Sequence, residues 1–451
     1  ACLGKCPSYT EHARQCFWVT LITGCWTTSM TCRVQRRLEF PVRGLLLRCA
    51  VAAGSIISRS PARQDHCGAQ MSFPDFVKTY KRSYTPGTEE YDLHQELFTS
   101  RVVEVRDHNC GRSGRLWRAG INNLADWKEE DLEHLLGSTS KAGGTAAAGL
   151  LHSSKQVAGA EPLLLARRPR QLPASYSWGH LSEIKRTRHQ GHCGSCWAVT
   201  AVSTMAAHAE IKGRLHDFSL SQVVACTPNP RSCGGTGGCH GATAELAFDY
   251  ALRVGLLSEQ SFPYPWESQS GPRELTCPQG MGLNSSQESA VQFMTTKDGL
   301  TMHTMTAVPA LQIGMSGWAS LPENKEKQLL QAVVEHGPVA VSVATGKNWR
   351  YYMDGIMNSD ECDPEYVMRH AVVLYGYGAE SNTNYWHLKN SWGPDWGESG
   401  NMRLQRVRDE ENRCGWDKEP SKGSGCIGGP DKVWVCGSCG ILYHAAFPLF
   451  S

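Results

Sequence analysis

The sequence lacks both a long apolar run and an excess of charge of one sign. Its 451 residues include 45 basic and 43 acidic side chains, and this balance provides no global field to attract nucleic acid or an anionic membrane. No apolar run reaches the ~18 residues that a membrane-spanning helix requires. We therefore expect neither nucleic-acid nor membrane partners, and the 41% of hydrophobic residues suits an ordinary globular core.

Cysteine, in contrast, is abundant. Of the 19 cysteines, eight precede residue 111 and eleven lie from Cys193 onward. Thiols at this density are usually paired in an oxidising compartment or bound to metal. Eleven cysteines allow one free thiol and five disulfide bridges. We expect a secretory route, ending in a lysosome-like vacuole or outside the cell.

The chain divides into four regions by composition. In residues 1–70, Cys, Trp and Arg are mixed without a period. The apolar stretch 44–54 resembles a poor secretory signal interrupted by Arg48, and an untranslated or disordered leader is the open alternative. Residues 71–137 carry helical spacing and predict a small helical module. Residues 138–171 are a linker, rich at first in Gly and Ala.

The linker ends in a basic cluster, Arg167-Arg168-Pro169-Arg170, which is a candidate site for proteolytic nicking. A merely solvated group of charges is the alternative. The composition changes from residue 172 onward: Cys, Trp and Gly are frequent in residues 172–451, and no low-complexity stretch occurs there. This composition predicts one compact domain. Apolar residues recur at helical spacing after Cys196, whereas 338–343, 371–375 and 385–389 favour strands. This order indicates an α+β domain.

The segment 190–197, Gln-Gly-His-Cys-Gly-Ser-Cys-Trp, carries the strongest chemical signal. A cysteine at a helix N-terminus is a candidate nucleophile, because the helix dipole and unpaired backbone N–H groups favour its thiolate. The same N–H groups, together with the side-chain amide of Gln190, can stabilise the oxyanion formed in acyl transfer. Cys196 is the candidate nucleophile.

The motif around Cys196 resembles that of papain-like cysteine proteases, whose His and Asn lie far downstream. His370, which begins the segment His-Ala-Val-Val-Leu-Tyr-Gly-Tyr-Gly, resembles the catalytic histidine of this family. Asn390, in Lys-Asn-Ser-Trp-Gly, resembles the asparagine that orients it, and Trp392 would shield their hydrogen bond from water. The resemblance implies a two-lobed fold, with a helical lobe, a β-rich lobe and the active site between them. It implies no metal or organic cofactor.

Each of these residues has an ordinary structural interpretation when taken alone. The repeated Cys-Gly-Ser-Cys at 193–196 and 436–439 also permits a zinc or dithiol-redox protein. That arrangement would consume Cys196 and leave His370 and Asn390 without a role. A further rival is a catalytically silent, disulfide-rich scaffold or adhesion protein on the same fold. The joint occurrence of the motifs favours the protease.

The resemblance further implies three disulfides: Cys193 with Cys239, Cys226 with Cys277, and Cys362 with Cys439. Four other cysteines lie outside the common set: Cys233, Cys414, Cys426 and Cys436. Cys414 with Cys426 is the nearest plausible bridge among them, although sequence cannot fix such connectivity.

The module at 71–137 resembles the inhibitory propeptide of cathepsin L-like proteases. It carries the ERFNIN pattern at Glu90, His94, Phe98, Arg101, Val105 and Asn109, in which His94 and Arg101 replace the expected Arg and Asn. A second motif follows at Gly120, Asn122, Leu124 and Asp126. The resemblance implies a zymogen whose propeptide blocks the cleft until the chain is cut between residues 138 and 171.

The same family match predicts the substrate pocket, with Thr243, Ala244, Ser342, Ala371 and Trp392 around it. Its small side chains would accept Leu, Phe or Val, and burying such a residue contributes roughly 1.5–3 kcal/mol. No His-His loop suited to dipeptidase activity is present, so we expect a monomeric endopeptidase acting on protein and peptide substrates. The insertion at 279–318 could cover part of the cleft and contains a glycosylation sequon at Asn284.

Overall fold

The computed structural model describes residues 71–111, 115–136, 171–265, 275–279, 291–295, 299–305 and 313–451. The leader at 1–70, the basic cluster of the linker and the sequon at Asn284 lie outside these residues. Within the described part of the chain, no helix is both long enough and apolar enough to cross a membrane.

The first described module is mainly helical. It comprises α1 (Phe73–Thr79), α2 (Glu89–Gly111), β1 (Trp117–Ala119) and α3 (Glu129–His134). Ser72 caps α1 by accepting a hydrogen bond from the Asp75 amide at 3.3 Å. The apolar side of α1 packs on α2, with the ring centroids of Phe76 and Phe98 4.9 Å apart. This packing accounts for the helical spacing seen in the sequence.

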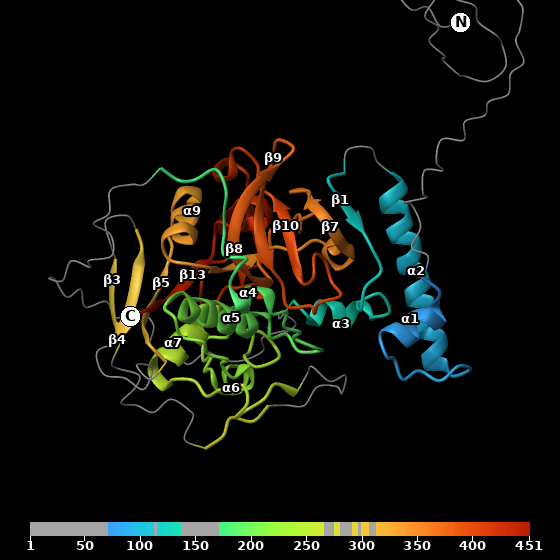
Figure 1. The fold of residues 1–451 in the computed structure, drawn as a ribbon, viewed down its shortest axis with the longest axis horizontal. Coiled ribbons are helices and arrows are strands. Elements are labelled where there is room, and N and C mark those ends of the chain that lie inside the picture. Colours follow the sequence, from blue (N-terminus) through green and yellow to red (C-terminus); the bar gives the residue numbers. More distant parts are fainter. Residues whose placement is uncertain are drawn as a thin grey trace, which may run out of the picture. The chain divides into compact units, whose positions relative to one another are not determined.

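The helical lobe is built around one buried helix. Its members are α4 (Ser182–Lys185), α5 (Cys196–Ile211), α6 (Leu220–Cys226) and α7 (Ala244–Val254). Every residue of α5 from Cys196 to Ala209 is buried, as expected for a helix that is apolar on all sides. The helix ends just before Gly213, whose positive φ of 76° suits glycine. These helices gather on one side of the long sheet (Figure 1).

A mixed sheet forms the second lobe, in the order β1-β7-β10-β9-β8-β6-β13-β5-β4-β3, with β2 paired to β8. The strands are β2 (Tyr176–Ser177), β3 (Val291–Thr295), β4 (Thr301–Met305), β5 (Met315–Ser320), β6 (Val339–Val343), β7 (Tyr352–Met357), β8 (His370–Glu380), β9 (Thr383–Lys389), β10 (Asn401–Gln405) and β13 (Ala445–Phe450). The three strands expected from the sequence correspond to β6, β8 and β9. Helix α9 (Glu326–Glu335) precedes β6.

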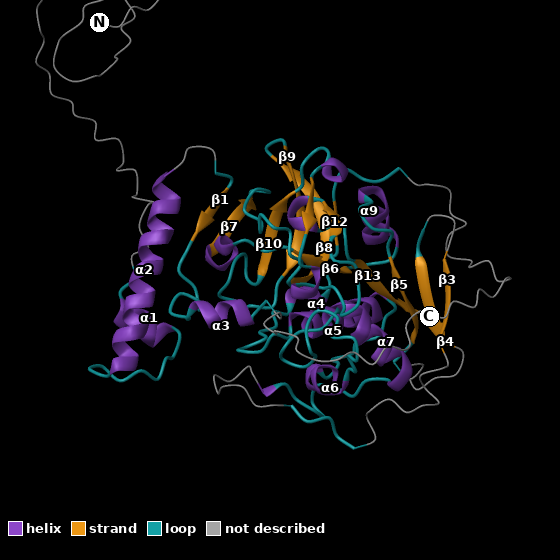
Figure 2. Cartoon of the chain, turned by 180° about the vertical axis from the view of Figure 1, so that it is seen from behind, coloured by secondary structure: helices purple, strands orange, loops and turns teal. Residues whose placement is uncertain are grey.

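Two features extend this sheet. Strand β1 of the N-terminal module pairs antiparallel with β7, so the module joins the sheet at one edge. At the other edge, β3 and β4 continue the sheet beyond β5. The described part of the 279–318 insertion therefore prolongs the sheet. Figure 2 shows from behind the helices α4 to α7 grouped below the strands.

A separate two-stranded hairpin consists of β11 (Cys414–Asp417) and β12 (Val433–Cys436). Four short 3-10 helices complete the described elements: η3 (Lys347–Tyr351), η4 (Glu410–Asn412), η5 (Pro420–Lys422) and η6 (Ser438–Gly440). We call the hairpin and the loop that joins its strands, residues 414–436, the insertion of the β-rich lobe, because they lie outside the long sheet between β10 and β13.

Candidate active site

The candidate nucleophile, Cys196, is the first residue of α5. It is 3% exposed and is the free cysteine among the described residues. Ser195 precedes the helix, and its hydroxyl lies 2.7 Å from the Tyr264 hydroxyl, which donates to the backbone oxygen of Gln190 at 2.9 Å. These buried contacts fix the turn that places the thiol at the helix N-terminus.

His370 and Asn390 come together from neighbouring strands. His370 begins β8, Asn390 directly follows β9, and the two strands pair antiparallel. The His370 Nε2 atom lies 2.8 Å from the Asn390 Oδ1 atom. His370 Nδ1 is buried and has no hydrogen-bond partner among the residues described, so this ring nitrogen remains available for a thiol or a leaving group. Trp392 packs against the imidazole with ring centroids 4.9 Å apart.

The side-chain amide of Gln190 points at a carbonyl of the N-terminal module. Its Nε2 donates to the Leu135 oxygen at 2.9 Å and to the Cys193 oxygen at 2.8 Å. The Ser391 hydroxyl in turn donates to Gln190 Oε1 at 2.6 Å. A backbone carbonyl of the N-terminal module thus accepts a hydrogen bond from the side-chain amide that was predicted to stabilise the oxyanion. Ser391 was not singled out from the sequence, although it directly follows Asn390.

A cavity beside the thiol brings most of the predicted pocket together. Thr243, Ala244, Ser342 and Ala371 line it, together with Cys196 and His370. Trp392 was expected in this pocket but does not line it, because its ring lies against His370 and Trp396 instead. The sequence also gave no sign that Met368, Gly423 and Ser424 line the cavity.

Burial shifts the pKa values of Cys196 and His370 toward their neutral forms. Loss of solvent raises the pKa of the Cys196 thiol to about 11, although the amides of Ala371, Trp197 and Cys196 act in the opposite direction. Burial also lowers the pKa of His370 to about 4, partly offset by its hydrogen bond to Asn390. A neutral thiol is a poor nucleophile, so the direction of this pKa shift disfavours attack by Cys196 in the covered site.

The N-terminal module supplies the cover. Leu135 is 1% exposed, and Leu136 lines the cavity beside Cys196. Trp127 stacks on His192 with ring centroids 3.9 Å apart and planes 4° apart. Asn123 Nδ2 lies 2.9 Å from a ring nitrogen of His189. The segment from Asn123 to Leu136 is therefore held against the residues that precede and surround the candidate nucleophile.

Inside the module, a buried ion pair organises the turn after β1. Asp126 is fully buried and accepts hydrogen bonds from Arg82 Nε at 2.9 Å and from the Tyr84 hydroxyl at 2.9 Å. His94 stacks on Tyr84, and its Nδ1 lies 2.7 Å from the Asp126 backbone oxygen. His94, which stands where the ERFNIN pattern has Arg, thus contacts the same turn.

The second departure from the ERFNIN pattern, Arg101, lies in an ionic network that reaches the β-rich lobe. Its guanidinium contacts Glu104 at 3.1 Å and Glu129 at 3.2 Å. Glu129 is also bound by Arg350, at 2.6 Å. Arg101 therefore connects α2 to α3 and, through Glu129 and Arg350, to the helix η3 of the β-rich lobe.

The structure contains five disulfides among its described residues. Three are the pairs implied by resemblance: Cys193–Cys239, Cys226–Cys277 and Cys362–Cys439. The expected Cys414–Cys426 bridge is wrong. Cys414 bonds to Cys436, its register partner across the hairpin, and Cys426 bonds to Cys233. Strand pairing brings Cys414 to Cys436 although Cys426 is nearer in sequence.

The pairing also separates the two Cys-Gly-Ser-Cys segments. Cys193, Cys436 and Cys439 each bond to a partner outside these segments, so their thiols do not form a four-thiolate site. No group of three or more potential metal ligands occurs within the described residues.

Comparison with known proteins identifies the class of molecule to which this site belongs. Residues 172–424 match the papain family of cysteine proteases, and residues 73–132 match the cathepsin propeptide inhibitor domain. The chain therefore belongs to the papain family of cysteine proteases and carries the inhibitory propeptide of a zymogen. Its fold is the two-lobed papain-like fold preceded by a helical propeptide.

Individual relatives are distant. The chain is 29% identical to cathepsin J of Rattus norvegicus over 80% of its own length and 93% of that protein. It is 28% identical to the oryzain beta chain of Oryza sativa subsp. japonica over 72% of its length, but spans only 60% of that relative. In structure, it resembles digestive procathepsin L 3 of Tenebrio molitor, with a TM-score of 0.56, 24% identity and coverage of 84% of this chain and 97% of that one.

Proposed function

We propose that this chain is the zymogen of a cysteine endopeptidase in which Cys196, His370, Asn390 and Gln190 carry catalysis. The observation that carries the proposal is the position of the Leu135 carbonyl, 2.9 Å from the Gln190 amide. This is the length of a normal N–H···O hydrogen bond. The Leu135 carbonyl therefore accepts a hydrogen bond from the side-chain amide of Gln190, the group that would donate to the oxygen of a substrate carbonyl during catalysis.

The proposed chemistry begins once the propeptide has left. The thiolate of Cys196 attacks the peptide carbonyl carbon, and the oxygen takes the negative charge. Gln190 Nε2 and the Cys196 amide donate hydrogen bonds to that oxygen. The His370 imidazolium, oriented by Asn390, gives its proton to the leaving amine and a thioester remains. His370 then accepts a proton from water, whose oxygen attacks the thioester carbon; the C–S bond breaks, the acid product leaves, and the thiolate and the imidazolium are restored.

The cavity supports a preference for an apolar residue at the second position before the scissile bond. Thr243, Ala244, Ser342 and Ala371 present small side chains there, so a Leu, Phe or Val side chain would have apolar neighbours. A peptide library that showed a preference for charged residues at this position would contradict the assignment.

We also propose the setting in which the enzyme works. The five disulfides favour the secretory pathway, with a vacuole or the extracellular space as the destination and Asn284 as a glycosylation site. Cleavage between residues 138 and 171 would release a monomeric mature enzyme that starts near Leu172.

Acid-activated wild-type protein and four variants test the catalytic assignment. We expect Cys196→Ala and His370→Ala to reduce peptide hydrolysis by at least about 10⁴-fold. Gln190→Ala should reduce kcat by about 10²-fold or more, as the loss of one oxyanion donor does elsewhere. His387→Gln, in the strand next to His370, is the matched control and should keep nearly full activity. Unchanged hydrolysis by the Cys196 variant would refute the assignment.

A further inference from the structure

The disulfide Cys233–Cys426 joins the two lobes at the cavity beside the thiol. Cys233 lies in the loop between α6 and α7 of the helical lobe, and Cys426 lies in the insertion 414–436 of the β-rich lobe. Two backbone hydrogen bonds flank the disulfide, from Gly234 to Gly425 at 3.0 Å and from Ile427 to Arg231 at 2.8 Å. We name residues 231–234 and 425–427, joined in this way, the strap.

The strap has firm supports on both lobes. On the helical side, Asn229 donates to the Cys233 oxygen at 2.9 Å and accepts from the Cys233 amide at 2.8 Å. On the other side, the Gly425 amide donates to Pro420 at 2.8 Å. A Cβ atom at Gly425 would approach the same Pro420 oxygen to 2.6 Å, so the backbone there is closely packed. These contacts favour a fixed connection between the lobes.

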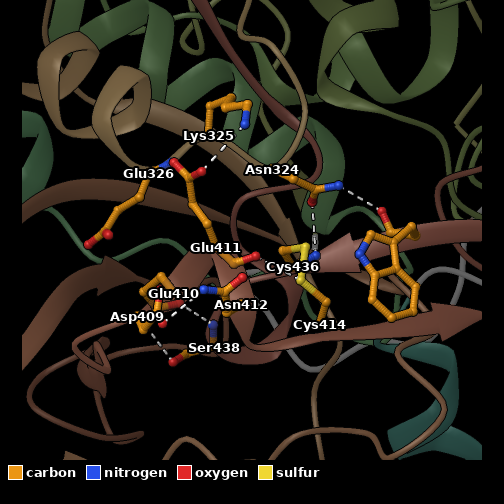
Figure 3. The surroundings of a disulfide bond; sticks show 11 residues. Asn324, Lys325, Glu326, Asp409, Glu410, Glu411, Asn412, Cys414, Cys436 and Ser438 are labelled. Carbon is orange, nitrogen blue, oxygen red and sulfur yellow. Dashed lines mark hydrogen bonds and ion pairs between the residues drawn. A yellow bond between two sulfur atoms is a disulfide. The ribbon is translucent and has the colours of Figure 1, made fainter.

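The base of the insertion is equally well anchored (Figure 3). Cys414–Cys436 closes the hairpin, and Asn324 accepts from the Cys436 amide at 2.9 Å. Buried Glu410 accepts from the Ser438 hydroxyl at 2.6 Å. Because its ends are held to the body of the lobe, the insertion can carry the strap as a rigid element.

The strap stands between two hollows. Gly234 lines the cavity that contains Cys196 and His370, whereas Arg231 and Cys426 line a second hollow. Ser424, next to the strap, lines both. Gly234 and Ser424 lie within two residues of Cys233 and Cys426, so the covalent connection between the lobes lies next to the cavity that contains the thiol.

We infer that the strap ends the series of substrate subsites at the proposed pocket. The third and fourth substrate residues before the scissile bond would then make no favourable contacts with the enzyme. An extended peptide binds a cleft chiefly through free main-chain donors and acceptors. Here the Gly234, Gly425 and Ile427 amides already donate within the protein. The inference rests on the proposed function, because it takes that pocket as the site of the second residue.

Fluorogenic peptides with two, three or four residues before the cleaved bond test the inference on acid-activated protein. For the wild type, we expect kcat/KM to stay within about twofold across the series, since no hydrogen bond is gained. In the double variant Cys233→Ser/Cys426→Ser, the four-residue peptide should gain about tenfold over the two-residue peptide, the equivalent of one added hydrogen bond. The matched control Cys226→Ser/Cys277→Ser removes a disulfide that involves neither the strap nor the insertion 414–436, and should keep the wild-type profile.

The wild-type series decides the matter even if the strap variant does not fold. A wild-type rate that rises about tenfold with the third or fourth residue would overturn the inference, as would a folded strap variant with an unchanged profile. Stoichiometric labelling of Cys196 identifies folded variants. Failure of the proposed function itself would look different, because no peptide of any length would then be cleaved.

Discussion

The covered thiol should react very slowly and with an unusual pH dependence. Burial under the propeptide raises the pKa of Cys196 from an ordinary value of 9.0 to about 11. At pH 7 this lowers the thiolate fraction from about 10⁻² to about 10⁻⁴, so alkylation should slow about 100-fold from ionisation alone. Steric cover by Leu135 and Leu136 can only add to this factor.

Iodoacetamide labelling of the intact zymogen between pH 6 and 10 measures this effect, with the Cys196 peptide quantified by mass spectrometry. The rate should still be rising about tenfold per pH unit at pH 10, because the thiol remains mostly protonated there. The same protein unfolded in urea, with its disulfides intact, is the control; its labelling rate should reach half of its maximum near pH 9 and level off by about pH 10. A folded zymogen whose rate levels off below pH 8 would refute the proposed burial of a neutral thiol.

Three further outcomes follow from the same contacts. Asp126→Asn removes the charge that holds Arg82 and should weaken inhibition by the separate propeptide by at least about tenfold, measured as Ki, because breaking a buried pair costs about 3–5 kcal/mol. Burial, with lesser contributions from the charges of His192 and Arg82, lowers the pKa of His189 to about 4. The propeptide complex should thus be fully stable above about pH 6.5 and should weaken steadily toward pH 4 as His189 is protonated. Protonation of the imidazole also removes the His189 nitrogen that accepts the hydrogen bond from the Gly191 amide. The variant His189→Gln should flatten this pH dependence of Ki. Ser391→Ala should lower kcat by about tenfold with little change in KM, by freeing the Gln190 amide from its 2.6 Å hydrogen bond; an equal effect on KM alone would contradict this.

The placement of the proposed catalytic residues was predictable in part, because local sequence determines the element that carries each of them. The apolar run after Cys196 gives the buried helix α5, and the β-branched run after His370 gives strand β8. Asn390 follows the strand that pairs with β8, so adjacent strands bring it to the histidine. The resemblance to a known family supplied the long-range part of this prediction, which spacing alone does not contain.

The remaining features depend on tertiary packing that no local pattern records. Cys414 faces Cys436 because of hairpin register, and Cys233 reaches Cys426 across 193 residues of sequence. The family match placed Trp392 at the pocket, but the turn after β9 directs its ring onto the histidine. The place of Ser424 beside the thiol likewise depends on the path of the insertion, for which the sequence offers no signal.

The central claim is that Cys196 is the nucleophile of a peptidase held inactive by its propeptide. Its most direct test is titration of acid-activated protein with an epoxide inhibitor of cysteine proteases, followed by peptide mapping and a Cys196→Ala control. We predict one equivalent of label on Cys196 and loss of peptide hydrolysis in proportion to labelling. A folded protein, freed of its propeptide, whose thiol does not react would instead indicate a catalytically silent member of the fold.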